Sequence, residues 1–281
     1  MTEAKGFPRL PLAGLTFSLA GPGRVGTSLA AWLEAAGARR IAAAGRAEIG
    51  ELETAGQDLL LIAVPDPVLQ DVAARLAGRP QARVALHTSG NLDASALAPL
   101  REGSAAGSLH PLKAFPRPLT DPAEAKGVFF AVDGDPEARS LAHRIAAAWG
   151  GISADVEAEV RPLYHFAATL SAGGVVTVLA LAEDLARRLG LPEAAVRGYL
   201  ELCRGAVAQA VATGTPAAVL TGPAARGDRA TVSGHLEALR ELAPDKLPLV
   251  IHLARETLSQ RERIGGLTAE QRELAAYLES L

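Results

Sequence analysis

The first 152 residues alternate between short apolar runs and segments with helical periodicity. Apolar runs of about four to seven residues are typical of strands buried in a parallel sheet. The segments between several of them place apolar residues three and four positions apart, as in amphipathic helices. This alternation predicts a doubly wound α/β sheet with helices on both faces. The predicted strands span residues 15–20, 40–44, 58–64, 83–88, 106–109 and 127–132, and the helices between them include 24–36, 68–77 and 136–149.

After residue 152 the pattern becomes helical throughout, and we expect no further strand. Helices are predicted at 156–189, 192–212, 229–242, 247–261 and 268–278. Pro162 either kinks the first of these or marks its true start. We therefore expect two domains, an α/β domain over 1–152 and an all-α domain over 153–281.

One part of the first predicted helix has no charged residue. Residues 162–182 contain no Asp, Glu, Lys or Arg, and 21 residues are long enough to cross a bilayer. Tyr164, His165 and Ser171 lie within this stretch, together with several small residues. These residues favour a helix buried in protein over one that faces lipid. We expect no membrane insertion and a homodimer that packs through the helical domain.

The most informative motif joins the first predicted strand to the first predicted helix. Gly21, Gly23 and Gly26 form G-x-G-x-x-G between the apolar run and the helical segment. This context is the one that the dinucleotide-binding fingerprint requires. The first glycine permits a tight turn, the second lets the backbone approach a pyrophosphate, and the third allows close packing of helix on strand. The sequence thus predicts a Rossmann domain with a nicotinamide cofactor.

The end of the second predicted strand indicates which cofactor. NAD-binding domains usually carry Asp or Glu there, to bind the ribose 2′-hydroxyl. Here the strand ends in Gly45-Arg46, and the nearest carboxylate is Glu48. A guanidinium matches phosphate oxygens, so we expect NADP(H), with NAD less favoured. Alternatively, Arg46 is an ordinary surface arginine. FAD is disfavoured because no second nucleotide motif appears.

Composition narrows the class of protein. The chain has 281 residues, 49% apolar and 21% charged, with a formal net charge of −3, which is typical of a globular protein. Charges are balanced in both halves, so no basic face suggests nucleic acid. The single cysteine, Cys203, excludes an internal disulfide and a multi-thiolate metal site, and we expect no metal. The N-terminal stretch lacks a signal-peptide pattern, which predicts a cytoplasmic protein.

Ligands of open parallel sheets bind beyond the carboxyl ends of the strands. His110 follows the fifth predicted strand and is the best proton donor in the first domain, because its ordinary pKa lies near neutrality. Lys113 lies three residues on, suited to a substrate carboxylate or to acid catalysis. Tyr164 and His165 complete the expected catalytic set, although a histidine on an apolar helix is more often a core residue. Ser171 and Arg226 are the expected substrate-binding residues, and Asp228 is expected to cap the helix that follows. The expected cofactor-binding residues are Gly21, Pro22, Gly23, Arg24, Val25, Gly26, Gly45, Arg46, Ala63, Val64, Pro65, Asp66, Thr88, Ser89 and Gly90.

Taken together, these motifs resemble the Rossmann-like proteins that carry the domain of unknown function 2520. The segments that carry the resemblance are 21–26, 63–66, 87–90, 107–112, 164–165 and 220–228, of which the last two are the more specific. The chain is also similar to pyrroline-5-carboxylate reductase, prephenate dehydrogenase and ketopantoate reductase. The resemblance implies an NADP-binding domain followed by a helical domain similar to the C-terminal domain of 6-phosphogluconate dehydrogenase, through which relatives commonly dimerise. Family members tend to have Ser-Asn in the long helix, where this chain has Ser171-Ala172, and this departure weakens any transfer of catalytic roles.

We therefore expect an NADP(H)-dependent oxidoreductase for a small carbonyl, hydroxyl or imine compound, with a ketopantoate-reductase-like role on a 2-oxo acid as the most concrete hypothesis. Its active site is expected in the cleft between the domains. The alternative, motivated by Ala172, is a nucleotide-binding sensor or scaffold without catalysis. A methyltransferase is disfavoured by Arg46, because methyltransferases prefer an acidic residue at that strand end.

Overall fold

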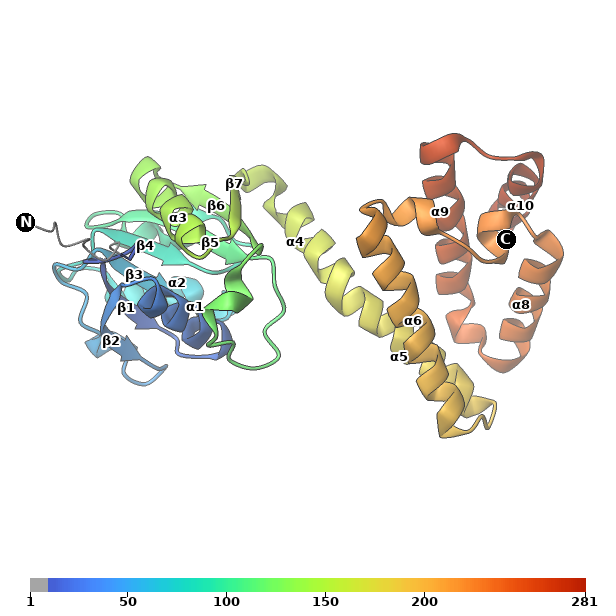
Figure 1. The fold of residues 1–281 in the computed structure, drawn as a ribbon, viewed down its shortest axis with the longest axis horizontal. Coiled ribbons are helices and arrows are strands. Elements are labelled where there is room, and N and C mark those ends of the chain that lie inside the picture. The colour runs from blue at the N-terminus through green and yellow to red at the C-terminus, as the bar shows by residue number, and fades with distance from the viewer. Residues whose placement is uncertain (1–9) are drawn as a thin grey trace, which may run out of the picture. The chain divides into compact units, whose positions relative to one another are not determined.

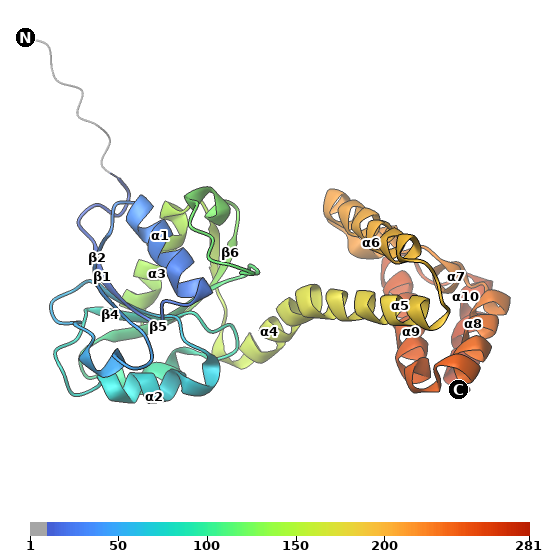
Figure 2. The ribbon, with the colours of Figure 1, turned by 90° about the horizontal axis from the view of Figure 1, so that it is seen from below.

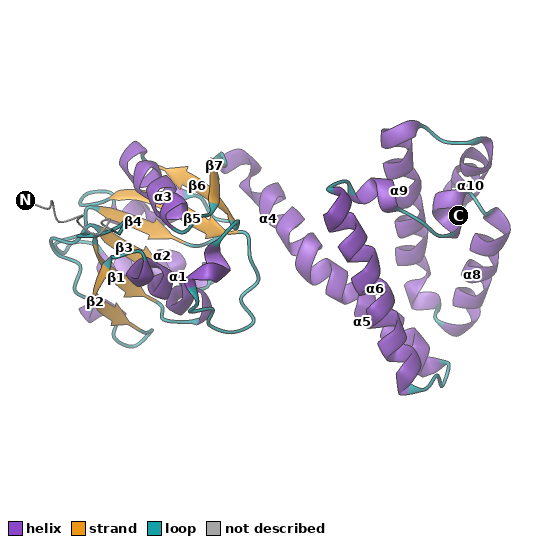
Figure 3. Ribbon diagram, viewed as in Figure 1, coloured by secondary structure: helices purple, strands orange, loops and turns teal. Residues whose placement is uncertain are grey.

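The computed structural model describes residues 10–281, and the chain divides into two compact units (Figure 1). The first unit extends to Gly173 and contains the sheet, and the second spans Gly174–Leu281. Figure 3 shows that the strands belong to the first unit and that the second is helical. The cytoplasmic prediction rests on the N-terminal stretch, and residues 1–9 of this stretch lie outside the described residues.

The sheet has seven strands in the order β2-β1-β3-β4-β5-β6-β7. Neighbouring strands are parallel except for β5 and β6, which are antiparallel. The chain runs from β1 outward to β2 and returns to the other side of β1, so β1 and β3 flank a topological switch point, where such sheets bind ligands. The strands are β1 (Thr16–Ala20), β2 (Arg39–Ala44), β3 (Leu59–Ile62), β4 (Val84–His87), β5 (Ala105–Pro111), β6 (Phe129–Gly134) and β7 (Ile152–Asp155).

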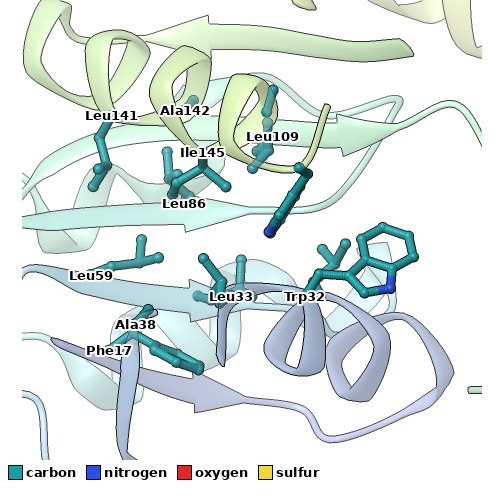
Figure 4. Close-up of a cluster of buried hydrophobic side chains, with 14 of the residues drawn as sticks. Phe17, Trp32, Leu33, Ala38, Leu59, Leu86, Leu109, Leu141, Ala142 and Ile145 are labelled. Carbon is teal, nitrogen blue, oxygen red and sulfur yellow. The ribbon is translucent and has the colours of Figure 1, made fainter. Parts of the chain in front are cut away.

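Helices cover both faces of this sheet (Figure 2). On one face lie α1 (Arg24–Ala35) and α3 (Pro136–Ala148), and on the other lies α2 (Asp66–Leu76). The strands β3 and β4 are buried at every position, as expected of apolar runs covered from both sides. Figure 4 shows the core under α1 and α3, where Ile145 lies beside Leu86 of β4, and Leu33 and Trp32 belong to the same cluster. The predicted doubly wound Rossmann domain is confirmed.

The second unit contains only helices, as predicted. They are α5 (Val175–Arg188), α6 (Glu193–Thr213), α7 (Pro223–Arg226), α8 (Arg229–Leu242), α9 (Leu247–Gly265) and α10 (Ala269–Glu279). A core of apolar side chains from α8, α9 and α10 holds its C-terminal part together. Asp228 caps α8 by accepting a hydrogen bond from the Thr231 backbone N–H at 3.1 Å, which confirms the predicted cap.

Two details of the sheet differ from the sequence prediction. The strand β6 runs antiparallel to β5, because the segment between them is a loop with a short 3₁₀ turn and no crossover helix. A further strand, β7, starts at Ile152, where we expected strands to end. With four residues of mostly exposed side chains, it lacks the apolar run that marks a buried strand. The predicted boundary at residue 152 therefore falls on a strand, and the contacts divide the chain at Gly173 instead.

The long uncharged helix also differs from its prediction. It begins as α4 (Arg161–Thr169), with Pro162 in its first turn, so the proline marks the start and not a kink. A π-helical turn over Leu170–Gly174 joins α4 to α5. Residues Ala158–Arg188 form one helix long and apolar enough to cross a membrane, yet its most apolar window is not buried within the chain. The expectation of a helix buried within one chain is therefore wrong for this window, although α6 packs against α5 and Ala186 is buried.

Candidate functional site

The glycine-rich turn between β1 and α1 leaves room for a ligand. Gly21 has φ +90°, and a Cβ there would lie 2.6 Å from the Ala63 carbonyl O. A Cβ on Gly26 would overlap the Gly21 carbonyl O. By contrast, a Cβ on Gly23 would meet nothing within 4 Å. Gly23 is also the N-cap of α1 and supplies no side-chain cap, so its open side leads to the N–H groups of the first helical turn. This geometry fits a pyrophosphate.

A cavity of about 510 Å³ opens beside this turn, at the switch point between β1 and β3. Eight of its lining residues are among the predicted cofactor-binding residues: Gly21, Pro22, Gly23, Gly45, Arg46, Ala63, Val64 and Pro65. The other five were missed by the sequence analysis: Ile49, Val68, Asp71, Val72 and Arg75. Three of these are apolar and suit the flat face of a nucleobase. Because four come from α2, only the folded chain shows that this helix borders the cavity.

The remaining predicted cofactor residues do not line this cavity. Arg24 donates to the Pro116 carbonyl O at 3.4 Å, and Val25 packs against the core. Asp66 opens α2. The segment 88–90 follows β4, one strand further along the sheet. A carboxylate does stand near the end of β2, where we expected none, because Glu48 Oε2 accepts a hydrogen bond from the Gly45 N–H at 3.3 Å.

Beyond the ends of β4 and β5, three aromatic side chains meet. His110, on β5, has its Nδ1 2.9 Å from the Tyr164 hydroxyl of α4, with the two rings perpendicular. The ring of His165 lies 6.0 Å from that of His110. A Cβ on Gly90 would lie 2.7 Å from His110 Nε2 and 2.6 Å from His165 Cδ2. The turn after β4 therefore packs directly against both imidazoles, and only glycine fits there.

Burial sets the protonation of this pair. Desolvation lowers the pKa of His110 to about 4, and electrostatic interactions with His165 and Arg161 act in the same direction. Desolvation raises the pKa of Tyr164 above its ordinary value. Near neutral pH, His110 is therefore an uncharged imidazole and Tyr164 a protonated phenol. Between them they hold a transferable proton without carrying charge.

These residues border a second cavity, of about 430 Å³. The Lys113 ammonium lies at its edge, 3.0 Å from the Glu124 carboxylate. Ser171 also lines it and donates its hydroxyl to the Ala167 carbonyl O at 2.8 Å. Ala172 is part of the same wall. The structure thus brings together five of the predicted residues within the first unit: His110, Lys113, Tyr164, His165 and Ser171.

The sequence analysis missed one buried charge near this cavity, Arg161. Its side chain is fully buried, and its Nη2 donates to the Ser89 carbonyl O at 3.1 Å. Its Nη1 lies 3.9 Å from the Asp133 carboxylate. The guanidinium therefore ties the start of α4 to the turn after β4, one residue before Gly90. A signal was present, because Arg161 directly precedes the long uncharged stretch.

Arg226 lies in the second unit, as the exposed last residue of α7. Its substrate-binding role stays a prediction. Cys203 is partly exposed on α6. Among residues 10–281, no group of three or more His, Cys, Asp or Glu side chains is placed to hold a metal ion.

This architecture is similar to that of known proteins. Residues 128–257 match the family model described as "Domain of unknown function (DUF2520)". No curated protein matches the chain in sequence. Among solved structures, a Thermotoga maritima protein has a TM-score of 0.71 at 22% identity, over 88% of this chain and 98% of its own.

Two further structures share the arrangement. A Bacteroides fragilis protein described as a candidate NADP oxidoreductase has a TM-score of 0.68 at 20% identity, over 86% of this chain and 97% of its own. Pyrroline carboxylate reductase of Plasmodium falciparum, solved with NADP bound, has a TM-score of 0.54 at 14% identity, over 90% and 98%. At these identities the likeness concerns the fold, and it confirms a Rossmann domain followed by a helical region.

Proposed function

From the Rossmann sheet and the match of residues 128–257 to the DUF2520 model, we infer that this chain is an NAD(P)H-dependent oxidoreductase that prefers NADP(H) and acts on a small carbonyl or imine compound. The observation that carries the proposal is the placement of two cavities along one sheet edge. One borders the ends of β1, β2 and β3, and the other borders the end of β5. The turn after β4 lies between them and packs on His110.

The first cavity would hold the adenosine and pyrophosphate parts of the cofactor. Gly21 and Gly23 bring the backbone to the pyrophosphate, and Val68 and Val72 offer an apolar face to adenine. A dinucleotide extended along the sheet edge from there reaches the turn after β4, which places its nicotinamide beside the second cavity. When bound, the reduced nicotinamide supplies a hydride to the substrate carbon.

The residues of the second cavity would supply the proton and the orientation. The Tyr164 hydroxyl, held by His110 Nδ1, donates a hydrogen bond to the substrate oxygen or nitrogen and passes on its proton as negative charge develops there. His165 closes the cavity beside this pair. The Lys113 ammonium attracts a carboxylate on the substrate in competition with Glu124, which favours 2-oxo acids and their imines.

A cavity of about 430 Å³ with mostly apolar walls and few polar groups suits a compound of modest size. The test is NADPH oxidation by the purified protein with a panel of 2-oxo acids and cyclic imines. Tyr164→Phe should lower kcat by about 100-fold or more while the Kd for NADPH stays within about twofold. NADPH binding without turnover of any panel member would instead favour the non-catalytic sensor.

We also propose that a second copy of the chain covers the exposed apolar helices. Leu163 and Phe166 of α4, Val176 of α5, and Leu202 and Val211 of α6 each expose more than half of their surface. A lipid bilayer is disfavoured as their cover, because the same part of α6 carries charged side chains that are unfavourable in hydrocarbon.

Molar mass in solution, measured by light scattering, tests the dimer. Val176→Asp and Leu202→Asp together should yield a monomer, because each would bury an unpaired charge in the interface. Ile152→Asp, an equally exposed apolar position on β7, is the matched control and should leave the mass unchanged. A wild-type monomer, or a protein that needs detergent to stay in solution, would overturn this proposal.

A further inference from the structure

A second arginine borders the cofactor cavity, and the sequence analysis gave it no role. Arg75 lies in the last turn of α2 and lines the same cavity as Gly45 and Arg46. Its Nη1 donates to the Arg46 carbonyl O at 3.3 Å. Its Nη2 lies 3.6 Å from the position that a Cβ on Gly50 would take. The guanidinium is therefore held against the segment that follows β2, although α2 and this segment are far apart in sequence.

Neither arginine is neutralised within the described part of the chain. No ion pair of Arg46 or Arg75 occurs among residues 10–281. Asp71 lies one helical turn before Arg75 and lines the same cavity, yet the guanidinium bonds to the Arg46 carbonyl. Glu48 is engaged with the Gly45 N–H. Two guanidinium groups thus border one cavity without forming an ion pair, and an anion placed between them would be attracted to both.

We propose that Arg75 and Arg46 together bind the 2′-phosphate of the adenosine half of NADP(H), with Arg75 as a specificity-determining residue. This rests on the proposed function, which puts adenosine in this cavity. The phosphate is the anion that such a ligand presents beside the end of β2. Guanidinium groups bind its oxygens through paired hydrogen bonds, and two of them satisfy more of these oxygens than one.

The local balance of charge explains why both arginines are needed. Arg46 and Arg75 carry two positive charges at this end of the cavity, and Glu48 and Asp71 carry two negative charges. Removing either arginine leaves a net negative charge where a phosphate dianion would have to bind. The 2′-hydroxyl of NAD(H) carries no charge, so its binding does not depend on this balance. Loss of Arg75 should therefore weaken NADPH binding selectively.

The experiment compares Arg75→Gln and Arg46→Gln with the wild-type protein by calorimetry. The ligands are NADPH and NADH, together with adenosine 2′,5′-bisphosphate and 5′-AMP, which isolate the adenosine half. Arg75→Gln should raise the Kd for NADPH and for the bisphosphate about 10- to 100-fold, and the Kd for NADH and 5′-AMP less than about twofold. Arg83→Gln is the matched control, because Arg83 is an exposed arginine just before the amino end of β4, whereas the cofactor cavity lies at the carboxyl ends of the strands. This variant should change none of the four Kd values.

The outcomes separate this inference from the proposed function. If wild-type protein binds neither NADPH nor NADH, the proposed function fails and the arginine pair fails with it. If NADPH binds but Arg75→Gln weakens NADPH and NADH equally, or weakens neither, the phosphate role of Arg75 is overturned and the oxidoreductase proposal stands. Thermal melts of each variant verify folding, and because both side chains are exposed we expect each melting temperature to stay within about 2 °C of the wild-type value.

Discussion

The stability of the first unit should fall steeply as the pH drops below 6.5, and His87 should account for a measurable share of the fall. His87 ends β4 and is fully buried. Its Nδ1 accepts a hydrogen bond from the Ser89 N–H at 3.2 Å, and its Nε2 donates to the Asp93 carbonyl O at 2.9 Å. These contacts fix one neutral tautomer. A second ring proton, on Nδ1, would point at the Ser89 N–H, and the positive charge of the imidazolium would be buried without a hydrogen-bond acceptor at Nδ1.

The size of the effect follows from the pKa. Burial is the main cause that lowers the pKa of His87 from 6.5 to about 4. Between these values the unfolded chain binds a proton that the folded chain does not, so stability is fully present above pH 6.5 and is lost as the pH falls. Moving from pH 7 to pH 5 removes about 2 kcal/mol for this one group. Burial also lowers the pKa of His110 to about 4, so this residue adds a loss of about the same size.

Urea unfolding followed by tryptophan fluorescence measures this loss, because both tryptophans, Trp32 and Trp149, lie in the first unit. In His87→Gln, the decrease in unfolding free energy between pH 7 and pH 5 should be about 2 kcal/mol smaller than in the wild type. Any packing defect of the variant lowers stability at both pH values and cancels in this difference. His143→Gln, on the partly exposed surface of the same unit, is the control and should not reduce the loss. Equal losses in His87→Gln and the wild type would refute the assigned burial and tautomer.

Three further predictions concern the second cavity. The pH profile of kcat/KM should stay flat through the ordinary histidine range, because the pKa of His110 is about 4 and that of Tyr164 is raised; an inflection near pH 6.5 that disappears in His110→Gln would contradict this. Gly90→Ala should place a methyl group against the rings of His110 and His165 and lower the free energy of unfolding by about 1–3 kcal/mol. It should also reduce kcat more than it weakens NADPH binding. A crystal structure with both rings in unchanged positions, or an unchanged kcat, would count against this prediction. Arg161→Met should lower the free energy of unfolding by about 3–5 kcal/mol, because it removes the hydrogen-bond donor to the Ser89 carbonyl O and leaves the Asp133 carboxylate without its cation. Arg161→Lys should recover part of that loss in the same urea assay.

The first unit was largely predictable from sequence because its signals are local. The run 58–64 is apolar at almost every position, as a strand covered on both faces must be, and β3 lies within it. The glycine spacing predicted the turn after β1, since Gly21 and Gly26 occupy positions that exclude any side chain. By contrast, β7 carries mostly exposed side chains, so no apolar pattern marks it. The antiparallel placement of β6 depends on the path of a loop, which local periodicity does not encode.

Some residues of the candidate site could likewise be predicted from local sequence, and others could not. Residues at strand ends, such as His110, could be found because the carboxyl edge of a parallel sheet collects ligand contacts whatever the loop sequences are. Arg75 and Arg161 could not be assigned in this way, because their roles depend on which segment, distant in sequence, lies next to them. The guanidinium of Arg75 reaches the segment after β2, and that of Arg161 reaches the turn after β4. Each of these guanidinium groups donates a hydrogen bond to a segment that is distant in sequence. Such a role can be assigned only when the position of that segment in the folded chain is known. On the proposal for Arg75, cofactor specificity depends on residues brought together at the ends of the strands more than on the glycine motif, and exchange of α2 residues should alter it without any change in the motif.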